Sequence, residues 1–416
     1  MTRRIYGGRA RATVAVITAW AALFGVELTG ARAAQGAPTD PQFITRSAPA
    51  PGVKYEGFTL STPRGDAYGH LLTVDLGNPR VGLDLVYPGA VGARAPVSRL
   101  ADARGAVAAV NGDFFHLTET QHPGVQATGA PVGPAVAGGQ RLKAAVPDGQ
   151  RFGPALPPGT GTENVIGIGM NRRARVDRLS LRGTVRTPRG TLPLRGLNQY
   201  AVAVGGVGAF TTDWGTTSRV RATCGTDTDR AAPCSTETYE VTVRKGRVAK
   251  VSETPGQGRI APKTVVLVGR EAGARALRKL RVGDRIHLGY RLVATERVPL
   301  AFAVGGFPIV RKGRPLDGLD QRTAAVRTCA GVGAGGRRFY LLVLDGGPEY
   351  RSGLTMSELA EVMRRFGARD AVNLDGGGSS TLVTRDPGSA EVTVRNHPSA
   401  GAERPVPNGI GVFTRT

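Results

Sequence analysis

The segment from residue 338 to 383 constrains the fold most, because strand, helix and strand signals follow one another within it. The apolar run 338–344 is typical of a buried strand. Residues 355–358 have the spacing of a capping box, apolar residues follow at helical spacing, and Gly367 stands where a glycine ends helices. A second apolar run, 371–374, comes next. This order predicts a βαβ unit with parallel strands.

An acid follows each strand of the predicted unit. Because parallel strands end at the same edge of a sheet, Asp345 and Asp375 are expected at one edge, where α/β sheets bind ligands. Three glycines follow Asp375, and their backbone can approach a ligand and turn its N–H groups toward an anion. A glycine-rich turn capped by Asp375 explains this loop alone, but the matching acid at Asp345 favours a site.

A third apolar run, 107–110, also ends in polar residues. Asn111, Gly112 and Asp113 follow it directly and a Phe pair comes after them. Asn-Gly is a common turn pair, so a β-turn whose Phe residues return to the core is the alternative interpretation. The similarity to the two acid-ending strands favours a place in the same site.

Arg322 and Thr323 follow a glycine-rich segment, 305–308. The planar guanidinium of arginine matches a phosphate group through two hydrogen bonds. Arginine is abundant in this chain, so the alternative is an exposed surface side chain. We predict that Arg322 contacts a phosphate in the site.

Together these motifs resemble the phosphodiester glycosidase family. The run Asn-Leu-Asp-Gly-Gly-Gly-Ser-Ser is long and unusual, which makes it the most specific of them. The resemblance covers about residues 55–155 and 296–416 and says little about the stretch between. The segments that carry it are 109–115, 305–308, 322–324, 345–346, 352–355, 373–381 and 403–408.

The resemblance implies hydrolysis of a sugar-1-phosphodiester at the glycosidic C–O bond, which releases a free sugar and a phosphomonoester. Such chemistry uses charge neutralisation at the phosphate and carboxylates at the anomeric centre. We expect Asp345 and Asp375 to act as acid/base or nucleophile, with Arg322 on the phosphate. The predicted substrate-binding residues are Asn111, Gly112, Asp113, Thr323, Asn373, Gly376, Gly377, Ser379 and Ser380, of which Asn111 and Asp113 hold the sugar.

Two other uses of these residues stay open. The reaction as implied needs no cofactor, but Asp113, Asp345 and Asp375, with Asn373, offer oxygen ligands of the kind that Ca²⁺ prefers. A non-catalytic protein that binds anionic glycans of the cell envelope is the alternative from a different class. The presence of both acids favours an enzyme.

The fold class predicted is α+β, with a mixed sheet core that contains the βαβ unit and flanking helices. Residues 53–160 and 296–416 are predicted to form the two parts of the glycosidase domain. Residues 161–295 contain short alternating stretches joined by turn residues, which is typical of antiparallel β structure. We interpret them as an inserted antiparallel β subdomain that shapes substrate access or binds glycan.

The charge of the chain points to an anionic partner. Lys and Arg number 55 against 32 Asp and Glu, which gives a formal net charge of +23. Such a surface attracts polyanions. The basic residues are spread along the chain, and no zinc-finger, helix-turn-helix or RRM signature is present, which disfavours nucleic acid. A phosphate-bearing glycan or glycoconjugate is the predicted substrate.

The N-terminus predicts export. Four arginines precede an apolar stretch that is too short to span a membrane, so residues 1–34 are interpreted as a bacterial signal peptide. Residues 35–52 are interpreted as a flexible linker. No membrane span is expected after cleavage, and the mature protein is predicted to be secreted or associated with the cell wall. Cys224 and Cys234 are predicted to form a disulfide, which fits that compartment.

Overall fold

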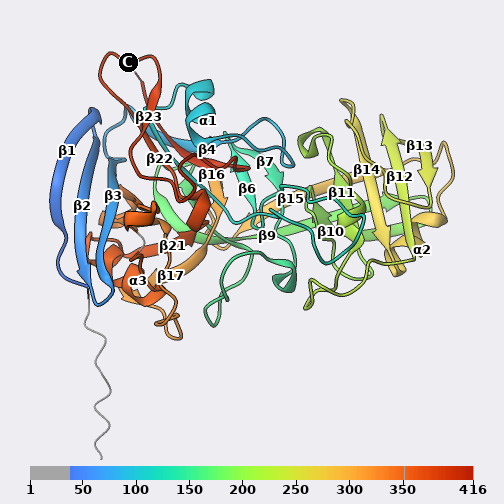
Figure 1. The fold of residues 1–416 in the computed structure, drawn as a ribbon. Helices are drawn as coiled ribbons and strands as arrows, with labels where there is room; N and C mark the ends of the chain where they lie inside the picture. The colour runs from blue at the N-terminus through green and yellow to red at the C-terminus, as the bar shows by residue number, and fades with distance from the viewer. Residues whose placement is uncertain (1–37, 351, 416) are drawn as a thin grey trace, which may run out of the picture. The chain divides into compact units, whose positions relative to one another are not determined.

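The computed structural model describes residues 38–350 and 352–415, and these residues belong to one compact unit (Figure 1). The predicted signal peptide lies outside them. The structure is mostly β: 24 strands and only three α-helices are found among the described residues, so the predicted α+β class fits loosely. The helices are α1 (Val97–Arg104), α2 (Ala272–Arg278) and α3 (Met356–Arg365).

An eight-stranded sheet carries the predicted βαβ region. Its strand order is β1-β2-β3-β20-β19-β21-β17-β18, and every neighbouring pair in it is antiparallel. The strands are β1 (Gln42–Ala50), β2 (Val53–Thr62), β3 (Gly65–Asp75), β17 (Phe307–Arg311), β18 (Arg314–Pro315), β19 (Thr328–Gly333), β20 (Arg338–Leu344) and β21 (Asp370–Leu374).

The elements of the βαβ unit are confirmed, but its two strands are not neighbours. Helix α3 begins with the predicted capping box between Thr355 and Glu358. Strand β19 forms a hairpin with β20 and pairs through its other edge with β21. Because β19 is antiparallel to both, β20 and β21 run parallel, as predicted. Their ends lie two strand spacings apart, or about 10 Å.

The other two sheets complete the fold. An eleven-stranded sheet has the order β13-β12-β14-β11-β10-β9-β8-β16-β6-β7, with β15 paired to β9, and a five-stranded sheet has the order β23-β22-β5-β24-β4. The strands of the larger sheet are β6 (Ala135–Ala137), β7 (Gln140–Lys143), β8 (Asn164–Gly169), β9 (Ala174–Thr187), β10 (Gly190–Leu197), β11 (Val207–Phe210), β12 (Thr238–Arg244), β13 (Arg247–Ser252), β14 (Thr264–Arg270), β15 (His287–Ala294) and β16 (Leu300–Gly305). Those of the smaller are β4 (Val81–Val86), β5 (Ala108–Asn111), β22 (Leu382–Arg385), β23 (Val392–Val394) and β24 (Gly409–Thr414).

The predicted inserted region, 161–295, is rich in strands, but it shares a sheet with the residues on both sides of it. Strand β8 pairs with β16, and β16 pairs with β6. Figure 1 shows β12 and β14 side by side with α2 next to them. The sheet is mixed, because β10 and β11 run parallel. One buried apolar cluster joins Phe210 and Val268 of this region to Leu72 of β3. The core is therefore continuous across the predicted boundaries.

The predicted flexible linker is wrong from residue 42 onward, where strand β1 begins. This strand pairs antiparallel with β2 along its length, so backbone hydrogen bonds hold it in place. Most of its side chains are exposed. Because no apolar alternation marks it, the sequence pattern resembles that of a tether.

The predicted disulfide between Cys224 and Cys234 is present. The buried carboxylate of Glu119 contacts His122 at 3.1 Å. It also accepts a hydrogen bond from the buried Arg221 guanidinium at 2.5 Å. Cys329 is buried on β19, and burial raises the pKa of its thiol.

Among the described residues, no helix combines the length and the apolar character that crossing a membrane requires.

Candidate functional site

The predicted site motifs come together where the chain passes from one sheet to another. The segment Gly305–Phe307 leaves the eleven-stranded sheet for the eight-stranded one, and residues 375–381 connect the eight-stranded sheet to the five-stranded one. Asn111 and Gly112 end β5 beside them: the N–H of Asp375 donates to the Gly112 carbonyl at 2.9 Å. Segments that are far apart in the sequence thus lie next to one another in the structure.

Asn111 holds the glycine-rich loop in place. Its amide nitrogen donates to the Asp375 carbonyl at 2.6 Å. Its amide oxygen accepts from the Thr328 hydroxyl at 2.9 Å and from the Thr381 N–H at 3.0 Å. The side chain is fully buried. These contacts give Asn111 a positioning role in the loop that carries Asp375.

Asp113 is buried beside two glycines. Its Oδ2 accepts a hydrogen bond from the Gly133 N–H at 2.6 Å, while its Oδ1 has no hydrogen-bond partner and only 2% of the residue is exposed. A Cβ added to Gly305 would lie 2.4 Å from Oδ2, so only glycine allows this approach. Burial raises the pKa of Asp113 to about 7, although Lys143 and the Gly133 N–H lower it.

Lys143 is a second buried ionisable group at this place. Its ammonium donates to the carbonyls of Val132 at 3.2 Å, Ala144 at 2.6 Å and Gly133. Burial lowers the pKa of Lys143 to about 7, while the nearby Asp113 raises it. The sequence does not distinguish this residue, since a lysine at the end of a short strand resembles any surface lysine.

Asp375 lies near Asp113 but is partly exposed. Burial raises the pKa of Asp375 to about 6, although a hydrogen bond with Ser379, the charge of Arg404 and the Gly376 N–H lower it. The negative charge of Asp375 also helps to raise the pKa of Asp113. A carboxyl group in this range exchanges its proton near neutral pH, as acid/base catalysis requires.

The glycine-rich loop uses most of its own N–H groups inside the fold. Residues 377–379 form a 3₁₀ turn, and the N–H groups of Gly377, Ser379 and Ser380 donate to the carbonyls of Val326, Gly376 and Gly377. The N–H of Gly376 interacts with the Asp375 carboxylate. Most of the loop N–H groups that were predicted to face an anion are therefore already bonded to acceptors within the protein.

Arg404 supplies the positive charge at this loop. Its Nη1 donates to the Ser379 hydroxyl at 3.3 Å, and a Cβ on Gly378 would lie 2.3 Å from its Nη2. The guanidinium is partly exposed. Arg404 lies in the segment 403–408, which carries part of the family resemblance, but it was not among the predicted site residues; its Glu-Arg-Pro pattern was the available signal.

The environment of Asp345 lowers the pKa of its carboxyl group, whereas that of Asp375 raises it. Its Oδ1 accepts from the Nε2 of His70 at 3.0 Å and from the N–H of His397 at 2.6 Å. The Nδ1 of His70 is 2.8 Å from the Tyr55 hydroxyl. Burial raises the pKa of Asp345, but the interactions with His70 and His397 outweigh it, and the pKa lies below its usual value.

The positions of the protons on the hydrogen-bonded side chains of Tyr55 and His70 follow from the negative charge of Asp345. An ionised carboxylate only accepts hydrogen bonds, so Nε2 of His70 carries a hydrogen. In a neutral imidazole Nδ1 is then an acceptor, and the Tyr55 hydroxyl donates to it. Tyr55, His70 and Asp345 are all buried, so the three groups form a fixed Tyr-His-Asp chain.

Aromatic rings lie at the rim beside Asp345. The rings of Tyr68 and Tyr350 meet edge to face with centroids 5.0 Å apart, and Tyr350 stacks on His397 at 4.5 Å. The His397 side chain is 59% exposed. Such partly exposed rings can contact the apolar face of a sugar.

Arg322 and Thr323 are both exposed, and their N–H groups donate to Asp320 at 2.8 and 3.1 Å. Within the described residues, no hydrogen bond or ion pair joins the Arg322 guanidinium to either acid. The buried Arg327 donates to the Leu354 and Thr323 carbonyls instead.

Two other predicted substrate-binding residues are buried. Asn373 is only 1% exposed, and both polar atoms of its side chain lack a partner. The hydroxyl of Ser380 lies 3.1 Å from that of Thr328 and donates to it, because the Thr328 hydrogen is used for Asn111. Thr328 thus contacts both Asn111 and Ser380, and these contacts hold the glycine-rich loop in place.

The three candidate metal ligands are not gathered around one point. In the part of the chain that the structure describes, the only set of three such groups within 4.8 Å of one another is His122 with Cys224 and Cys234, and these cysteines form the disulfide. Asp113 and Asp375 interact, while Asp345 follows a strand two positions away.

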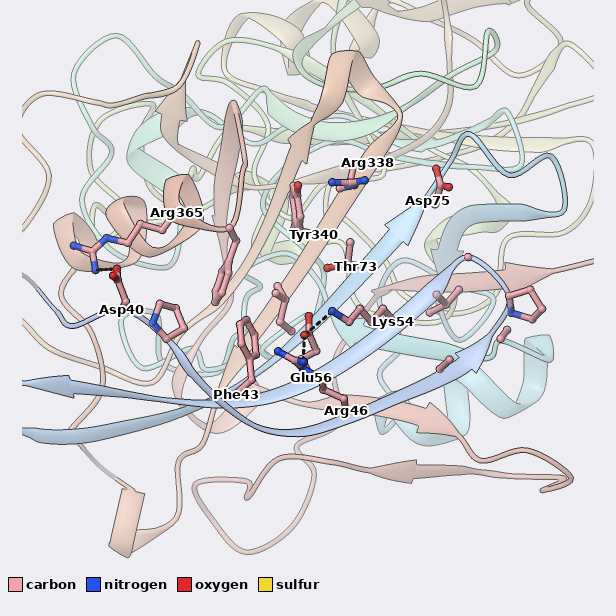
Figure 2. A pocket seen from close by; sticks show the side chains of 18 residues that line it. Asp40, Phe43, Arg46, Lys54, Glu56, Thr73, Asp75, Arg338, Tyr340 and Arg365 are labelled. Carbon is pink, nitrogen blue, oxygen red and sulfur yellow. Dashed lines mark hydrogen bonds and ion pairs between the residues drawn. The ribbon is translucent and has the colours of Figure 1, made fainter.

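A hollow of about 830 Å³ lies elsewhere, between β1 and the strands β2, β3 and β20 (Figure 2). None of the predicted site residues lines it. Five of its charged groups form ion pairs: Glu56 pairs with Arg46 and Lys54, and Arg365 pairs with Asp40.

The fold and this geometry define a mostly β protein with a carboxylate-rich site at the meeting point of three sheets. Residues 237–413 match the family model of phosphodiester glycosidases, which confirms the predicted resemblance. The match includes Asp345, Asp375 and Arg404 and begins after Asn111 and Asp113. No match is found among curated proteins.

Two solved structures share the fold, and a third aligns less well. A hypothetical protein from Synechocystis aligns with a TM-score of 0.66 at 20% identity over 91% of this chain, which spans 64% of that protein's length. A Burkholderia pseudomallei protein aligns with a TM-score of 0.62 at 23% identity, over 86% of this chain and 74% of that one. The zebrafish N-acetylglucosamine-1-phosphodiester alpha-N-acetylglucosaminidase catalytic domain gives 0.44 at 14% identity, over 91% and 89%.

Proposed function

We propose that the protein hydrolyses a sugar-1-phosphodiester of a cell-envelope or extracellular glycoconjugate at the glycosidic C–O bond. The observation that carries the proposal is a carboxyl group with a pKa of about 6 placed beside an arginine, in a stretch that matches phosphodiester glycosidases. Arg404 lies where it can hold the phosphate, next to Asp375. The products are a free sugar and a phosphomonoester.

The two acids take different roles in this proposal. Asp345 stays ionised and stabilises positive charge at the anomeric carbon, because its hydrogen bonds favour the carboxylate. Asp375 moves a proton near neutral pH. A phosphate leaving group has a low pKa and departs without full protonation, so activation of water is the main task for Asp375.

The supporting groups bind and position. Arg404 replaces Arg322 as the first phosphate contact, and Arg322 reaches the substrate from the exposed loop when the substrate is bound. Asn111 positions the Asp375 loop, while the rings of Tyr350 and His397 hold the sugar.

The test is turnover of a panel of p-nitrophenyl and UDP-type sugar-1-phosphodiesters by the protein from residue 35 onward. Hydrolysis in H₂¹⁸O distinguishes the bonds: glycosidic cleavage places ¹⁸O in the sugar, and P–O cleavage places it in the phosphate. Asp375→Asn is expected to lose activity, while the exposed Asp317→Asn retains it as the matched control. Label in the phosphate, or equal activity of Asp375→Asn, contradicts the proposal.

The reaction needs no cofactor as proposed, and Ca²⁺ held by Asp113 and Asp375 is the alternative that EDTA treatment tests. Secretion or cell-wall association is part of the same proposal, and the Cys224–Cys234 disulfide supports an oxidising compartment. A non-catalytic protein that binds anionic glycans is the second candidate function. Absence of turnover on the whole panel by folded protein supports that candidate.

A further inference from the structure

A second hollow, of about 600 Å³, lies where three connections of the eleven-stranded sheet meet. Arg186 comes from the end of β9, Lys245 and Arg247 from the turn between β12 and β13, and Arg285 from the approach to β15. His287, the first residue of β15, completes the charged lining. No Asp or Glu lines this hollow, so its formal charge is +4 with His287 neutral.

The cations face one another in pairs across the backbone ladder. His287 is the register partner of Arg186, and Arg247 forms an antiparallel bridge with Arg285. Side chains directly opposite in an antiparallel pair lie close together on the same face, and like charges there are destabilising. The like-charged pair Arg247 and Arg285 at the hollow indicates a function that outweighs this cost.

These four cations are not neutralised by the fold. None of Arg186, Lys245, Arg247 and Arg285 forms an ion pair with an acid in the described part of the chain, and all four are exposed. The Arg247 guanidinium donates to the Gly283 carbonyl at 2.9 Å, which fixes its direction. The hollow of Figure 2 differs, because it contains acids and two of them, Glu56 and Asp40, pair with its bases.

The positive charge continues along the same ribbon. Arg182 and Arg291 are register partners on β9 and β15, four residues from the pair of Arg186 and His287. Since side chains alternate along a strand, a four-residue step returns to the same face, about 13 Å further on. A ligand with anionic groups repeated along a chain fits this arrangement, whereas a single free phosphate does not.

We propose that this surface binds a polymer whose repeating units are joined by phosphodiesters, such as poly(glycerol phosphate) or a sugar-phosphate chain. Guanidinium groups bind phosphate through paired hydrogen bonds, and three exposed arginines and one lysine line this hollow. The hollow has no aromatic lining on which nucleobases would stack, which favours a polymer without bases. The proposal does not rest on hydrolysis, because binding is measured directly.

The test compares two triple variants of the mature chain that lose the same charge. Arg186→Gln/Arg247→Gln/Arg285→Gln removes the surface, and Arg99→Gln/Arg297→Gln/Arg314→Gln removes three exposed arginines elsewhere. Affinity for labelled poly(glycerol phosphate) is measured by fluorescence anisotropy at several salt concentrations. The first variant is expected to bind at least about 10-fold more weakly and with a reduced salt slope, as phosphate contacts predict. The control is expected to lose less than about 3-fold.

Each other outcome contradicts the proposal. Equal losses in both variants indicate general charge attraction without a site. Tighter binding of single-stranded DNA than of poly(glycerol phosphate), lost in the first variant, indicates a nucleic-acid surface. Thermal unfolding confirms that each variant is folded, and the single variant Arg186→Gln repeats the measurement if the triple variant is unstable.

Discussion

The surroundings of Asp345 and Asp375 differ although both acids follow parallel strands of one sheet. Asp345 accepts hydrogen bonds from His70 and from the His397 backbone, and its pKa is lowered. Asp375 is desolvated beside a second buried acid, Asp113, and its pKa is raised to about 6. Environments that push two pKa values apart separate a permanent anion from a proton-exchanging group. Position in the fold alone does not assign the roles.

The largest expected effect comes from removing either charge. Asp375→Asn and Asp345→Asn should each lower kcat by about 10³-fold, within the range for acid/base groups. The stability effects should have opposite signs. The raised pKa of Asp375 means that its ionisation weakens the fold as pH rises through about 6, so Asp375→Asn should gain on the order of 1 kcal/mol at pH 8 and little at pH 4.

The sign for Asp345 is reversed. Its lowered pKa contributes stability above the unfolded value of 3.8, and that stability is lost as pH falls through the folded pKa. Asp345→Asn should therefore lower Tm at pH 8. Thermal unfolding at pH 4 and pH 8 measures both variants, with Asp317→Asn as the neutral control. The same sign for both would remove the contrast between the two acids.

Next in size is Arg404, which belongs to the Asp375 side alone. Arg404→Gln should raise KM by about 10²-fold for a phosphodiester, because a charge-assisted phosphate contact is lost. Arg404→Lys should recover part of it. The exposed Arg99→Gln provides the matched control. If KM stays unchanged and only Tm falls, Arg404 braces the loop through Ser379 and does not bind the substrate.

A smaller effect is expected on the Asp345 side from Tyr55→Phe. Without the hydroxyl donor, His70 is less firmly held, and the pKa of Asp345 should rise toward its usual value. The acid limb of the pH–rate profile should then move to higher pH, with a loss of no more than about 2-fold at pH 4 and little change at pH 7. His70→Ala should move the limb further. A uniform loss at all pH values would indicate a structural role only.

The smallest effect on catalysis is expected from the disulfide, which lies outside the site. Cys224→Ser/Cys234→Ser should cost about 2–3 kcal/mol of unfolding free energy, as expected for a short closed loop. The activity at 25 °C should stay within about 2-fold, since no site residue contacts this loop. Denaturant unfolding measures the loss, and Cys329→Ser serves as a separate control for the buried thiol.

Local signals in the sequence predicted the secondary-structure elements that carry the candidate site. Strands β20 and β21, the capping box of α3 and the loop after Asp375 each depend on residues that are close in sequence. The sequence did not indicate that β19 lies between β20 and β21, because the same apolar pattern is compatible with a hairpin and with a crossover connection. Strand β1 was missed for the converse reason, since its side chains are exposed and only its backbone is held.

The charge states of the site could not be predicted from the sequence. The Tyr55–His70–Asp345 chain joins residues up to 275 positions apart, so no spacing signals it. Lys143 became notable only through its burial against three carbonyls. The role expected for the N–H groups of the glycine-rich loop depended on acceptors such as the Val326 carbonyl, which precedes β19 and is distant in sequence.

The meeting of three sheets at the site also bears on how the chain can be divided. The stretch 237–413 carries the family match, yet Asn111, which holds the loop of Asp375, lies far upstream of it on β5. Strands β3 and β5 fill places inside sheets that this stretch alone would leave open. Neither half of a chain cut at residue 236 should be active by itself, so the site can serve as a reporter of complete assembly. Restored activity on mixing the two halves would turn this single chain into a split enzyme.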